Sequence, residues 1–314
     1  MTAPAPRNPT SAVVMACDAG YAPYALVLAQ SIIASHPVRD FDILIFSQDA
    51  IAVPQGLADA GVRVEGFARA NPYTNGPHVS RHGADTYLRL LLPEQLAGRY
   101  GRLLYLDSDI LCMGGDLGRL LKADMQGHAL GAIRDNTQWR TPGRLLPEFR
   151  AMKRSARPYF NAGVLLIDTA AWMAQGIGAQ CEALFAQKAQ IMTRHDQSLL
   201  NIVADGQWAE LSPVWNWQYT WSSRFFADLA GPKLVHFIGA RKPWKDVKKA
   251  LPARFRAPYA AAAAQFPTHH DLANLDDAAP AWPENLRKSF LKHWWAAPAM
   301  AAYLARFPDP YKAR

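Results

Sequence analysis

A short apolar run that ends in two carboxylates constrains the fold of this chain more than any other feature. The run Leu103–Leu106 (LLYL) is followed at once by Asp107-Ser108-Asp109. Four apolar residues in a row predict a strand buried on both faces, which is typical of a parallel sheet. Residues i and i+2 of an extended chain point to the same side, and open α/β sheets bind ligands at this edge. Two hard oxygen ligands there suit Mg²⁺ or Mn²⁺ with a bound phosphate.

Short apolar runs alternate with helical patterns over the first two thirds of the chain. The predicted strands are Ser11–Ala16, Phe41–Phe46, Val62–Phe67, Leu103–Leu106, Leu130–Ile133 and Gly163–Ile167. One helix is predicted from Pro23 to about Ser35, and another over Ala84–Leu96 with Pro93 disturbing its last turn. This alternation predicts an α/β fold with a mostly parallel central sheet flanked by helices.

The composition indicates one core domain with a C-terminal extension. The chain has 314 residues, of which 50% are hydrophobic, enough for one large α/β domain with an appendage. The three cysteines are an odd number without metal spacing, which indicates a reducing compartment and no disulfide framework. No apolar stretch reaches about 18 residues and the first residues lack an apolar core, so neither a membrane span nor a signal peptide is expected.

The positive charge is concentrated near the C-terminus. The net charge of the chain is +8, yet residues 1–240 hold 21 basic and 20 acidic side chains. Residues 241–256 hold seven basic and one acidic side chain, and residues 281–314 hold six basic and two acidic ones. A localised basic patch indicates either an anionic partner, such as phosphate, lipid head groups or nucleic acid, or a plain solvated surface.

Two further segments leave alternatives open. The segment 136–158 is polar, basic and broken by three prolines, so it is either a loop over the site or a surface insertion. In residues 281–314, aromatic side chains alternate with basic ones, which is typical of segments on an anionic membrane surface. The aromatic residues are Trp282, Phe290, Trp294, Trp295, Tyr303 and Phe307. The alternative is that they pack back on the core.

Four segments occur together in an order and spacing that resemble family 8 of the retaining glycosyltransferases. They are Leu103–Asp109 (LLYLDSD), Tyr159–Asp168 (YFNAGVLLID), His195–Asn201 (HDQSLLN) and His236–Trp244 (HFIGARKPW). That family includes bacterial lipopolysaccharide galactosyl- and glucosyltransferases and glycogenin. The resemblance covers roughly residues 11–245, and it implies a GT-A nucleotide-sugar fold, a Mn²⁺ ion (with Mg²⁺ as the alternative) and a UDP-sugar donor.

The resemblance also divides the chain and implies its partners. Residues 11–245 would form the catalytic domain, and 246–314 a basic and aromatic helical extension. The implied acceptor is a saccharide or glycolipid such as lipopolysaccharide, and no nucleic acid is expected. The implied location is the cytoplasm, either free or attached peripherally to the inner face of the cell membrane through residues 281–314.

The resemblance assigns metal and diphosphate roles to five residues. Asp107 and Asp109 match the metal-binding DxD pair, of which the first residue also binds the ribose of the donor, and His236 matches the third metal ligand of the family. An imidazole suits Mn²⁺ without adding negative charge. Gly239 would allow close approach of the backbone to the diphosphate, and Lys242 would neutralise charge as UDP leaves.

The remaining roles fall on the nucleoside and the sugar. Ala16, Asp18 and Tyr21 match the uracil-binding segment, and Arg89 matches a residue near the donor sugar or diphosphate. Ser108, between the two carboxylates, is included among the donor-binding residues.

Asn161, Ala162 and Gly163 match the segment that cradles the donor sugar. Asp196 would bind sugar hydroxyls, and Gln197 would lie nearest the anomeric carbon on the face opposite the leaving group. Because an amide is a poor nucleophile, the hypothesis is that departure and attack occur on one face of the sugar, with Gln197 stabilising positive charge through its carbonyl.

Two other enzyme classes compete with this interpretation. A glycogenin-like self-glucosylating enzyme needs an acceptor tyrosine, and none of the 11 tyrosines stands out. Phosphatases that form an aspartyl-phosphate also use an apolar run followed by DxD, but they carry it on the first strand, whereas here three predicted strands precede it.

Overall fold

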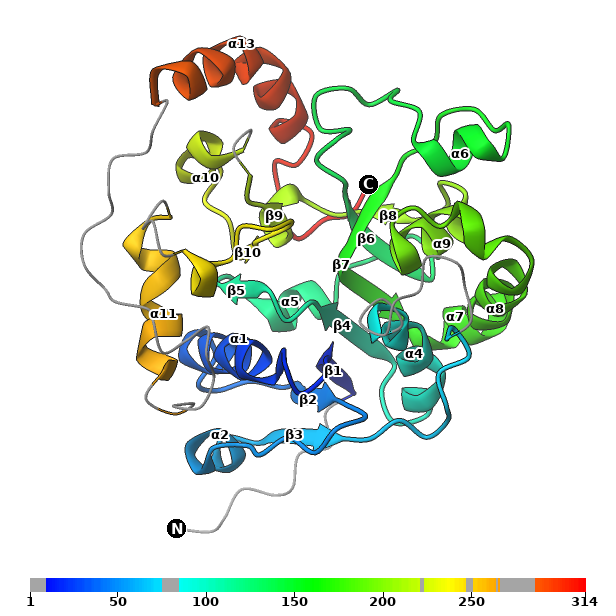
Figure 1. Cartoon of the computed structure of the whole chain (residues 1–314), viewed down its shortest axis with the longest axis vertical. Coiled ribbons are helices and arrows are strands. Elements are labelled where there is room, and N and C mark those ends of the chain that lie inside the picture. Colours follow the sequence, from blue (N-terminus) through cyan, green and yellow to red (C-terminus); the bar gives the residue numbers. More distant parts are fainter. Residues whose placement is uncertain (1–9, 75–84, 221–222, 247–250, 264, 266–285) are drawn as a thin grey trace.

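A seven-stranded sheet forms the centre of the computed structural model, which describes residues 10–74, 85–220, 223–246, 251–263, 265 and 286–314 (Figure 1). The strand order is β3-β2-β1-β4-β7-β6-β8. The strands are β1 (Ser11–Ala16), β2 (Asp42–Phe46), β3 (Val62–Glu65), β4 (Arg102–Leu106), β6 (Leu130–Arg134), β7 (Phe160–Asp168) and β8 (Ala209–Glu210). All neighbouring pairs are parallel except those that β7 makes with β4 and β6. The predicted α/β class with a mostly parallel sheet is confirmed.

The reversed direction of β7 matters for the site. The carboxyl ends of β1 and β4 lie at one edge of the sheet, where ligands bind. Because β7 runs the other way, its first residues, Asn161–Gly163, come to that same edge, and the backbone N–H of Asp107 donates to the carbonyl of Gly163 at 2.8 Å. The apolar run alone predicted this strand but not its direction.

A second, three-stranded sheet lies beside the first, in the order β5-β10-β9. It consists of β5 (Ile110–Cys112), β9 (Trp217–Gln218) and β10 (Leu234–His236). Since His236 pairs with Ile110 and Phe237 donates its N–H to the carbonyl of Asp109 at 3.0 Å, this sheet brings His236 to the end of β4.

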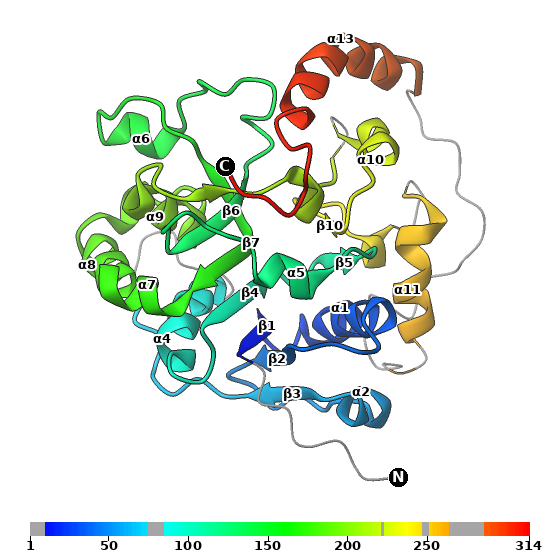
Figure 2. The same cartoon turned by 180° about the vertical axis from the view of Figure 1, so that it is seen from behind.

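Helices cover both faces of the large sheet (Figure 2). The helices of the described residues are α1 (Ala22–Ser35), α2 (Gln55–Asp59), η1 (Thr86–Leu91, 3₁₀), α4 (Leu92–Leu96), α5 (Leu117–Leu121), α6 (Pro147–Ala151), α7 (Thr169–Gln175), α8 (Ile177–Lys188), η2 (Ala189–Ile191, 3₁₀), α9 (His195–Ala204), η3 (Pro213–Trp215, 3₁₀), α10 (Arg224–Ala230), η4 (Pro243–Lys245, 3₁₀), α11 (Ala253–Ala263) and α13 (Leu286–Leu304). Leu103 and Tyr105 join one apolar cluster, and Leu104 and Leu106 join the other. This alternation is what burial of β4 on both faces requires.

The helix predicted over residues 84–96 is wrong in detail. From Thr86 to Leu91 the chain is a 3₁₀-helix, and an α-helix follows from Leu92 to Leu96. Ala84, where the predicted helix starts, lies outside the described residues. Pro93 lies in the first turn of that α-helix rather than disturbing its last turn. A proline is tolerated there because its missing N–H has no partner within the first turn of a helix.

The C-terminal extension returns to the central sheet. Arg306 pairs with the buried carboxylate of Glu210 at 2.7 Å, and Arg134 pairs with the same carboxylate at 2.8 Å. Arg314 and Glu210 also exchange both backbone hydrogen bonds. No helix in the described part of the chain is both long and apolar enough to cross a membrane.

Some aromatic residues of the segment 281–314 pack on the core, and others are exposed. Tyr303 and the following Phe307 are buried in a cluster with Trp139 and Trp217. By contrast Phe290, Trp294 and Trp295 are 63%, 66% and 80% exposed. Trp282 lies outside the described residues.

Candidate active site

Asp107, Asp109 and His236 meet where β4 ends and β10 passes beside it. Each offers one ligand atom, and these atoms all lie within 4.8 Å of one another. Nε2 of His236 is 3.0 Å from Oδ1 of Asp109 and 3.7 Å from Oδ2 of Asp107. The structure thus brings together the three residues predicted as metal ligands.

The donor set fits a divalent cation. Oδ1 of Asp109 is buried and accepts no hydrogen bond of good geometry within the described residues. Nδ1 of His236 lies 2.9 Å from Oδ1 of Asn216, to which it donates. A histidine held in this way directs Nε2 at its ligand, the usual arrangement around bound metals. Two carboxylates and one imidazole are a plausible set for Mn²⁺.

Lys242 balances the charge of Asp109. Its Nζ lies 2.5 Å from Oδ2 of Asp109 and 2.7 Å from the carbonyl of Phe237. Burial alone would raise the pKa of Asp109, but His236 and Lys242 together hold the pKa of this carboxyl well below its usual range. Asp109 is therefore charged at neutral pH, as a metal ligand has to be.

Gly163 is packed directly under these side chains. A Cβ at this position would lie 2.2 Å from Cε1 of His236 and 2.8 Å from Oδ2 of Asp107. Any side chain would therefore displace both predicted metal ligands. Gly239 is a glycine for a different reason, because its φ of +76° is a conformation that L side chains rarely adopt.

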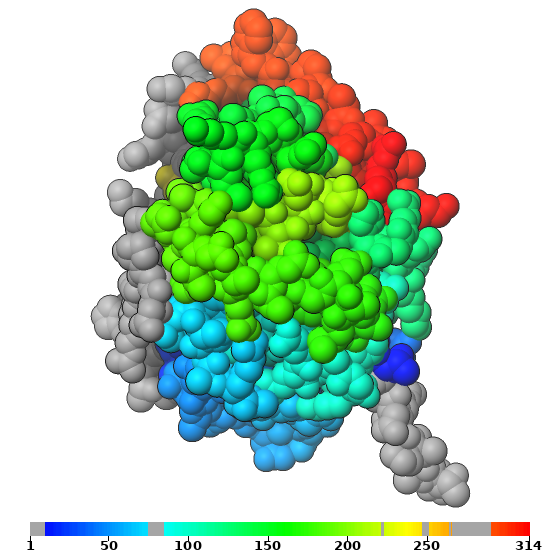
Figure 3. All heavy atoms as spheres, turned by 90° about the vertical axis from the view of Figure 1, so that its right-hand side faces the viewer, coloured from blue at the N-terminus to red at the C-terminus, as the bar shows by residue number. Residues whose placement is uncertain are grey.

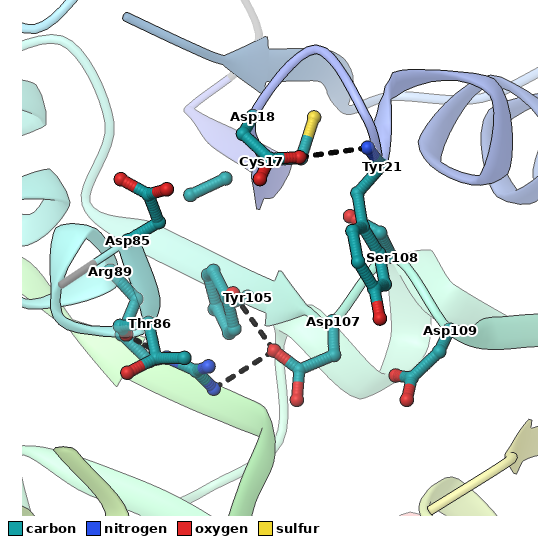
Figure 4. A pocket seen from close by; sticks show the side chains of 11 residues that line it. Cys17, Asp18, Tyr21, Asp85, Thr86, Arg89, Tyr105, Asp107, Ser108 and Asp109 are labelled. Atoms are coloured by element: carbon teal, nitrogen blue, oxygen red, sulfur yellow. Dashed lines mark hydrogen bonds and ion pairs between the residues drawn. The ribbon is translucent and has the colours of Figure 1, made fainter. Parts of the chain in front are cut away.

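A pocket of about 470 Å³ opens beside the carboxylates (Figure 4). It is lined by Ala16, Cys17, Asp18, Tyr21, Asp85, Thr86, Arg89, Tyr105, Asp107, Ser108 and Asp109. Six of the predicted donor-binding residues are on this wall, namely Ala16, Asp18, Tyr21, Arg89, Asp107 and Ser108. Cys17, Asp85 and Tyr105 were missed by the sequence reasoning. Burial raises the pKa of the Cys17 thiol to about 12, so it is not a ready nucleophile.

The end of β1 supplies the upper wall in Figure 4. Oδ1 of Asp18 accepts a hydrogen bond from the backbone N–H of Tyr21 at 2.8 Å, which holds the turn into α1. Tyr21 is 42% exposed and lies edge-on to Tyr24 and Trp244. A half-exposed phenol ring beside a carboxylate suits a planar base.

Arg89 cross-links the pocket. Its guanidinium lies 2.9 Å from a carboxylate oxygen of Asp107 and 2.9 Å from one of Asp196, and it donates to the carbonyl of Ala162 at 2.7 Å. Burial alone would lower the pKa of Arg89, but the two carboxylates raise it. Tyr105 lies under the guanidinium at 4.6 Å and donates its hydroxyl to Asp107 at 2.9 Å. The two ion pairs of Arg89 thus hold Asp196 close to Asp107, one of the predicted metal ligands.

Asp196 lies at the start of α9 and is buried. Burial raises its pKa to about 6, although Arg89 opposes the shift. A carboxyl in this range changes charge near neutral pH, a property concentrated at functional sites.

Gln197 is held as a fixed dipole. Its Oε1 accepts from Nδ2 of Asn161 at 3.0 Å and from the backbone N–H of Ala162 at 3.1 Å. Its Nε2 donates to Asp135 at 3.2 Å, and Arg194 donates to the same carboxylate oxygen at 2.8 Å. Asp135 is buried directly after β6, and the sequence reasoning missed it.

A chain of hydrogen bonds joins Gln197 to His236. Oδ1 of Asn161 accepts from the backbone N–H of Gly163 at 3.1 Å and from Nδ2 of Asn216 at 2.8 Å, and Oδ1 of Asn216 faces His236. The backbone donors fix which atom of each amide is the oxygen. Asn216, fully buried and also missed, therefore links the predicted sugar site to the predicted metal site.

Comparison with known proteins agrees with this fold and site. Residues 12–248 match the family described as glycosyl transferase family 8. The match covers most of the chain, so the chain belongs to this family, as the four segments predicted.

Individual relatives are more distant. The chain is 29% identical over 178 residues to the glycosyltransferase GlyF of Streptococcus pneumoniae, covering 55% of this chain and 40% of that protein. It is 26% identical over 170 residues to the lipopolysaccharide glucosyltransferase WaaO of Escherichia coli, covering 51% of this chain and 49% of that protein. The matched part thus spans about half or less of these two relatives.

The fold is shared with solved glycosyltransferases. The galactosyltransferase LgtC, solved in complex with donor and acceptor sugar analogs, superposes with a TM-score of 0.56 at 24% identity, covering 88% of this chain and 99% of that chain. Because the sequence identity is below 25%, this structural similarity shows that the two proteins share the GT-A fold and nothing more.

Proposed function

We propose that this protein is a retaining hexosyltransferase that moves galactose or glucose from a UDP-sugar to a saccharide acceptor. The observation that carries the proposal is that ion pairs and hydrogen bonds link two groups of side chains beside one pocket. Asp107, Asp109 and His236 form a cation site, and Asp196 and Gln197 are joined to it through Arg89 and Asn161. In this proposal residues 11–245 form the catalytic domain.

Each part of the site takes one part of the donor. Ala16, Asp18 and Tyr21 bind the uracil, with Ser108 beside the ribose. The Asn161–Gly163 segment and Asp196 bind the hexose, and Arg89 fixes Asp196 relative to Asp107. Lys242, with the Gly239 turn beside it, neutralises the diphosphate. A bound Mn²⁺ or Mg²⁺ would supply Lewis-acid stabilisation of the UDP leaving group.

Gln197 acts as a preorganised amide in this mechanism. Three hydrogen bonds already hold it, so its dipole needs no reorganisation as charge develops at the anomeric carbon. An amide does not form a stable glycosyl bond as a carboxylate would, so attack on the same face as departure is the simpler route to retention.

UDP release from two donors tests this function. UDP-galactose and UDP-glucose are each incubated with the protein and Mn²⁺, with and without excess chelator, and UDP is measured. Slow release from one donor that stops with chelator is the expected result, since water replaces the missing acceptor. Absence of both release and UDP binding would overturn the proposal.

The acceptor in this proposal is lipopolysaccharide or another surface glycan at the inner face of the cell membrane. The exposed Phe290, Trp294 and Trp295 on α13 support a peripheral attachment, together with the exposed Lys292. Trp294→Ala with Trp295→Ala should abolish sedimentation with phosphatidylglycerol vesicles. The pair leaves the buried Tyr303 in place, so a retained thermal transition is the control. Unchanged sedimentation would contradict the attachment.

A further inference from the structure

The segment 136–158 concentrates positive charge on the surface of the protein. Its basic residues are Arg140, Arg144, Arg150, Lys153, Arg154 and Arg157. Its single acidic residue, Glu148, is completely buried, whereas all six basic residues are exposed. The exposed charge of this segment is therefore entirely positive.

Within the described residues, two of these six side chains have an acidic partner. Arg154 and Arg157 lie 3.5 and 3.6 Å from Oδ1 of Asp205. The other four form no ion pair with any carboxylate in the described part of the chain. A guanidinium group without a carboxylate partner is a ready ligand for phosphate or carboxylate oxygens.

Buried polar contacts give the segment a defined shape. The side chain of Gln138, fully buried, donates to the carbonyls of Arg144 and Arg157 at 2.9 and 3.0 Å and accepts from the backbone of Tyr159 at 2.9 Å. Trp139 donates to the carbonyl of Arg134 at 2.6 Å. The basic side chains thus project from a fixed scaffold.

The scaffold is attached to the helix that carries Asp196 and Gln197. The segment leaves β6 directly after Asp135, which binds Gln197. In its middle, Glu148 of α6 accepts a hydrogen bond from Ser198, the residue after Gln197, at 2.6 Å. In Figure 3 the segment, in green, lies between α13, in orange, and the yellow-green helices α8 and α9.

We infer that Arg140, Arg144, Arg150 and Lys153 bind anionic groups on the acceptor, so that the acceptor is a saccharide bearing phosphate or carboxylate groups. The inference rests on the proposed function for the identification of this ligand as an acceptor. The segment is attached to α9 through Glu148 and Ser198. Its contact with α13 is made by Trp139 through the buried Tyr303, and not through the exposed aromatic residues of that helix. A saccharide therefore fits it better than a lipid surface.

Binding measurements test the inference without requiring sugar transfer. The probes are maltose, maltose 1-phosphate and the corresponding disaccharide with a terminal glucuronic acid, titrated calorimetrically with UDP and Mn²⁺ present. Maltose 1-phosphate or the glucuronide should bind on the order of tenfold tighter than maltose at low salt. The difference should shrink at 0.3 M NaCl, because salt screens exposed charges. The two anionic probes distinguish phosphate from carboxylate recognition.

Two variants that remove equal charge make the test specific. Arg144→Gln with Arg150→Gln should abolish the preference for the anionic probe. Lys188→Gln with Lys312→Gln, at exposed positions outside the segment, should preserve it. Equal affinity of all three probes, or identical behaviour of the two variants, would overturn the inference.

Two further measurements distinguish this inference from the proposed function and from membrane binding by the same surface. The Arg144 and Arg150 variant should still release UDP from the donor in water as wild type does. If no donor turns over but the anionic preference persists, the proposed function fails and the basic surface stands as a binding site. If this variant instead loses binding to phosphatidylglycerol vesicles and keeps its saccharide affinities, the surface serves the membrane and the inference is wrong.

Discussion

The two sides of the site differ in how their polar groups are satisfied. On one side the carboxylates of Asp107 and Asp109 face Nε2 of His236, and a buried oxygen of Asp109 has no hydrogen bond of good geometry within the described residues. On the other side the amides of Gln197 and Asn161 have both ends bound within the protein. In the proposed function a cation completes the first side, whereas the second is organised before any ligand arrives. Loss of a side chain should therefore abolish binding on the first side and slow turnover on the second.

Asp109→Asn should have the largest effect. It removes the charge that both His236 and Lys242 stabilise, and it leaves Lys242 without its carboxylate partner. UDP release should fall on the order of 1000-fold, and calorimetry with Mn²⁺ alone should show no binding. A Mn²⁺ affinity within threefold of wild type would show that Asp109 is not a ligand. Asp124→Asn, at an exposed position, is the matched control.

Gln197→Ala should slow turnover without affecting nucleotide affinity. The side chain hydrogen-bonds to Asn161, Ala162 and Asp135, and within the described residues it makes no hydrogen bond to a predicted metal ligand. The UDP dissociation constant should therefore change less than about twofold. Turnover should fall about 100-fold, the typical effect of removing one preorganised dipole. Asp135→Ala should give a similar but smaller loss, since the amide remains but loses its partner. A complete loss of UDP binding in the Gln197 variant would contradict its assignment to the sugar side.

Variants of Asn216 distinguish the roles of the two sides, because its side chain hydrogen-bonds to His236 on the first side and to Asn161 on the second. Asn216→Ala removes the acceptor for Nδ1 of His236 and the donor to Asn161. Mn²⁺ affinity should fall about tenfold, as is typical when the partner of a metal-binding histidine is removed. Asn216→Asp keeps an acceptor for His236 but loses the donor to Asn161, so it should retain Mn²⁺ affinity while turnover falls. Equal Mn²⁺ affinities in the two variants would show that the hydrogen bond to His236 does not control metal binding.

The sequence predicted the first side of the site better than the second. Asp107 and Asp109 follow an apolar strand, and the carboxyl-end rule for parallel sheets applies to them directly. The same rule was available for Asp135, which follows the predicted strand Leu130–Ile133 after a single arginine. No comparable rule identifies Asn216, which lies between two tryptophans and acts only through contacts that form in the folded chain.

Local sequence patterns also could not predict the direction of β7 or the helix type of Thr86–Leu91. A buried apolar run reads the same in either direction, so nothing in Gly163–Ile167 reveals that β7 is antiparallel. The 3₁₀ geometry of Thr86–Leu91 places Arg89 between Asp107 and Asp196, and these contacts come from elements far apart in sequence. Tertiary contacts of this kind override local helix preference.

The smallest expected effect concerns Asp196 and the pH dependence of the free energy of unfolding. Burial raises its pKa to about 6, above the value near 3.8 of a free carboxyl. Between these two values the folded state binds more protons than the unfolded state, so stability falls as pH rises. The contribution of this group to the free energy of unfolding is complete below about pH 4 and lost as pH rises through about 6. The loss should be roughly 1–3 kcal/mol.

The measurement is urea unfolding of the metal-free protein, with chelator, from pH 4 to pH 7.5. Asp196→Asn cannot titrate, so the difference in the free energy of unfolding between wild type and this variant should change over the range pH 4–7. Asp59→Asn, at an exposed position, should follow the wild-type curve. Parallel curves for wild type and Asp196→Asn would mean that Asp196 keeps an ordinary pKa. The ion pair with Arg89 would then offset the cost of burying Asp196 in full. The second side of the site would thus have its charge balanced as well as its hydrogen bonds made.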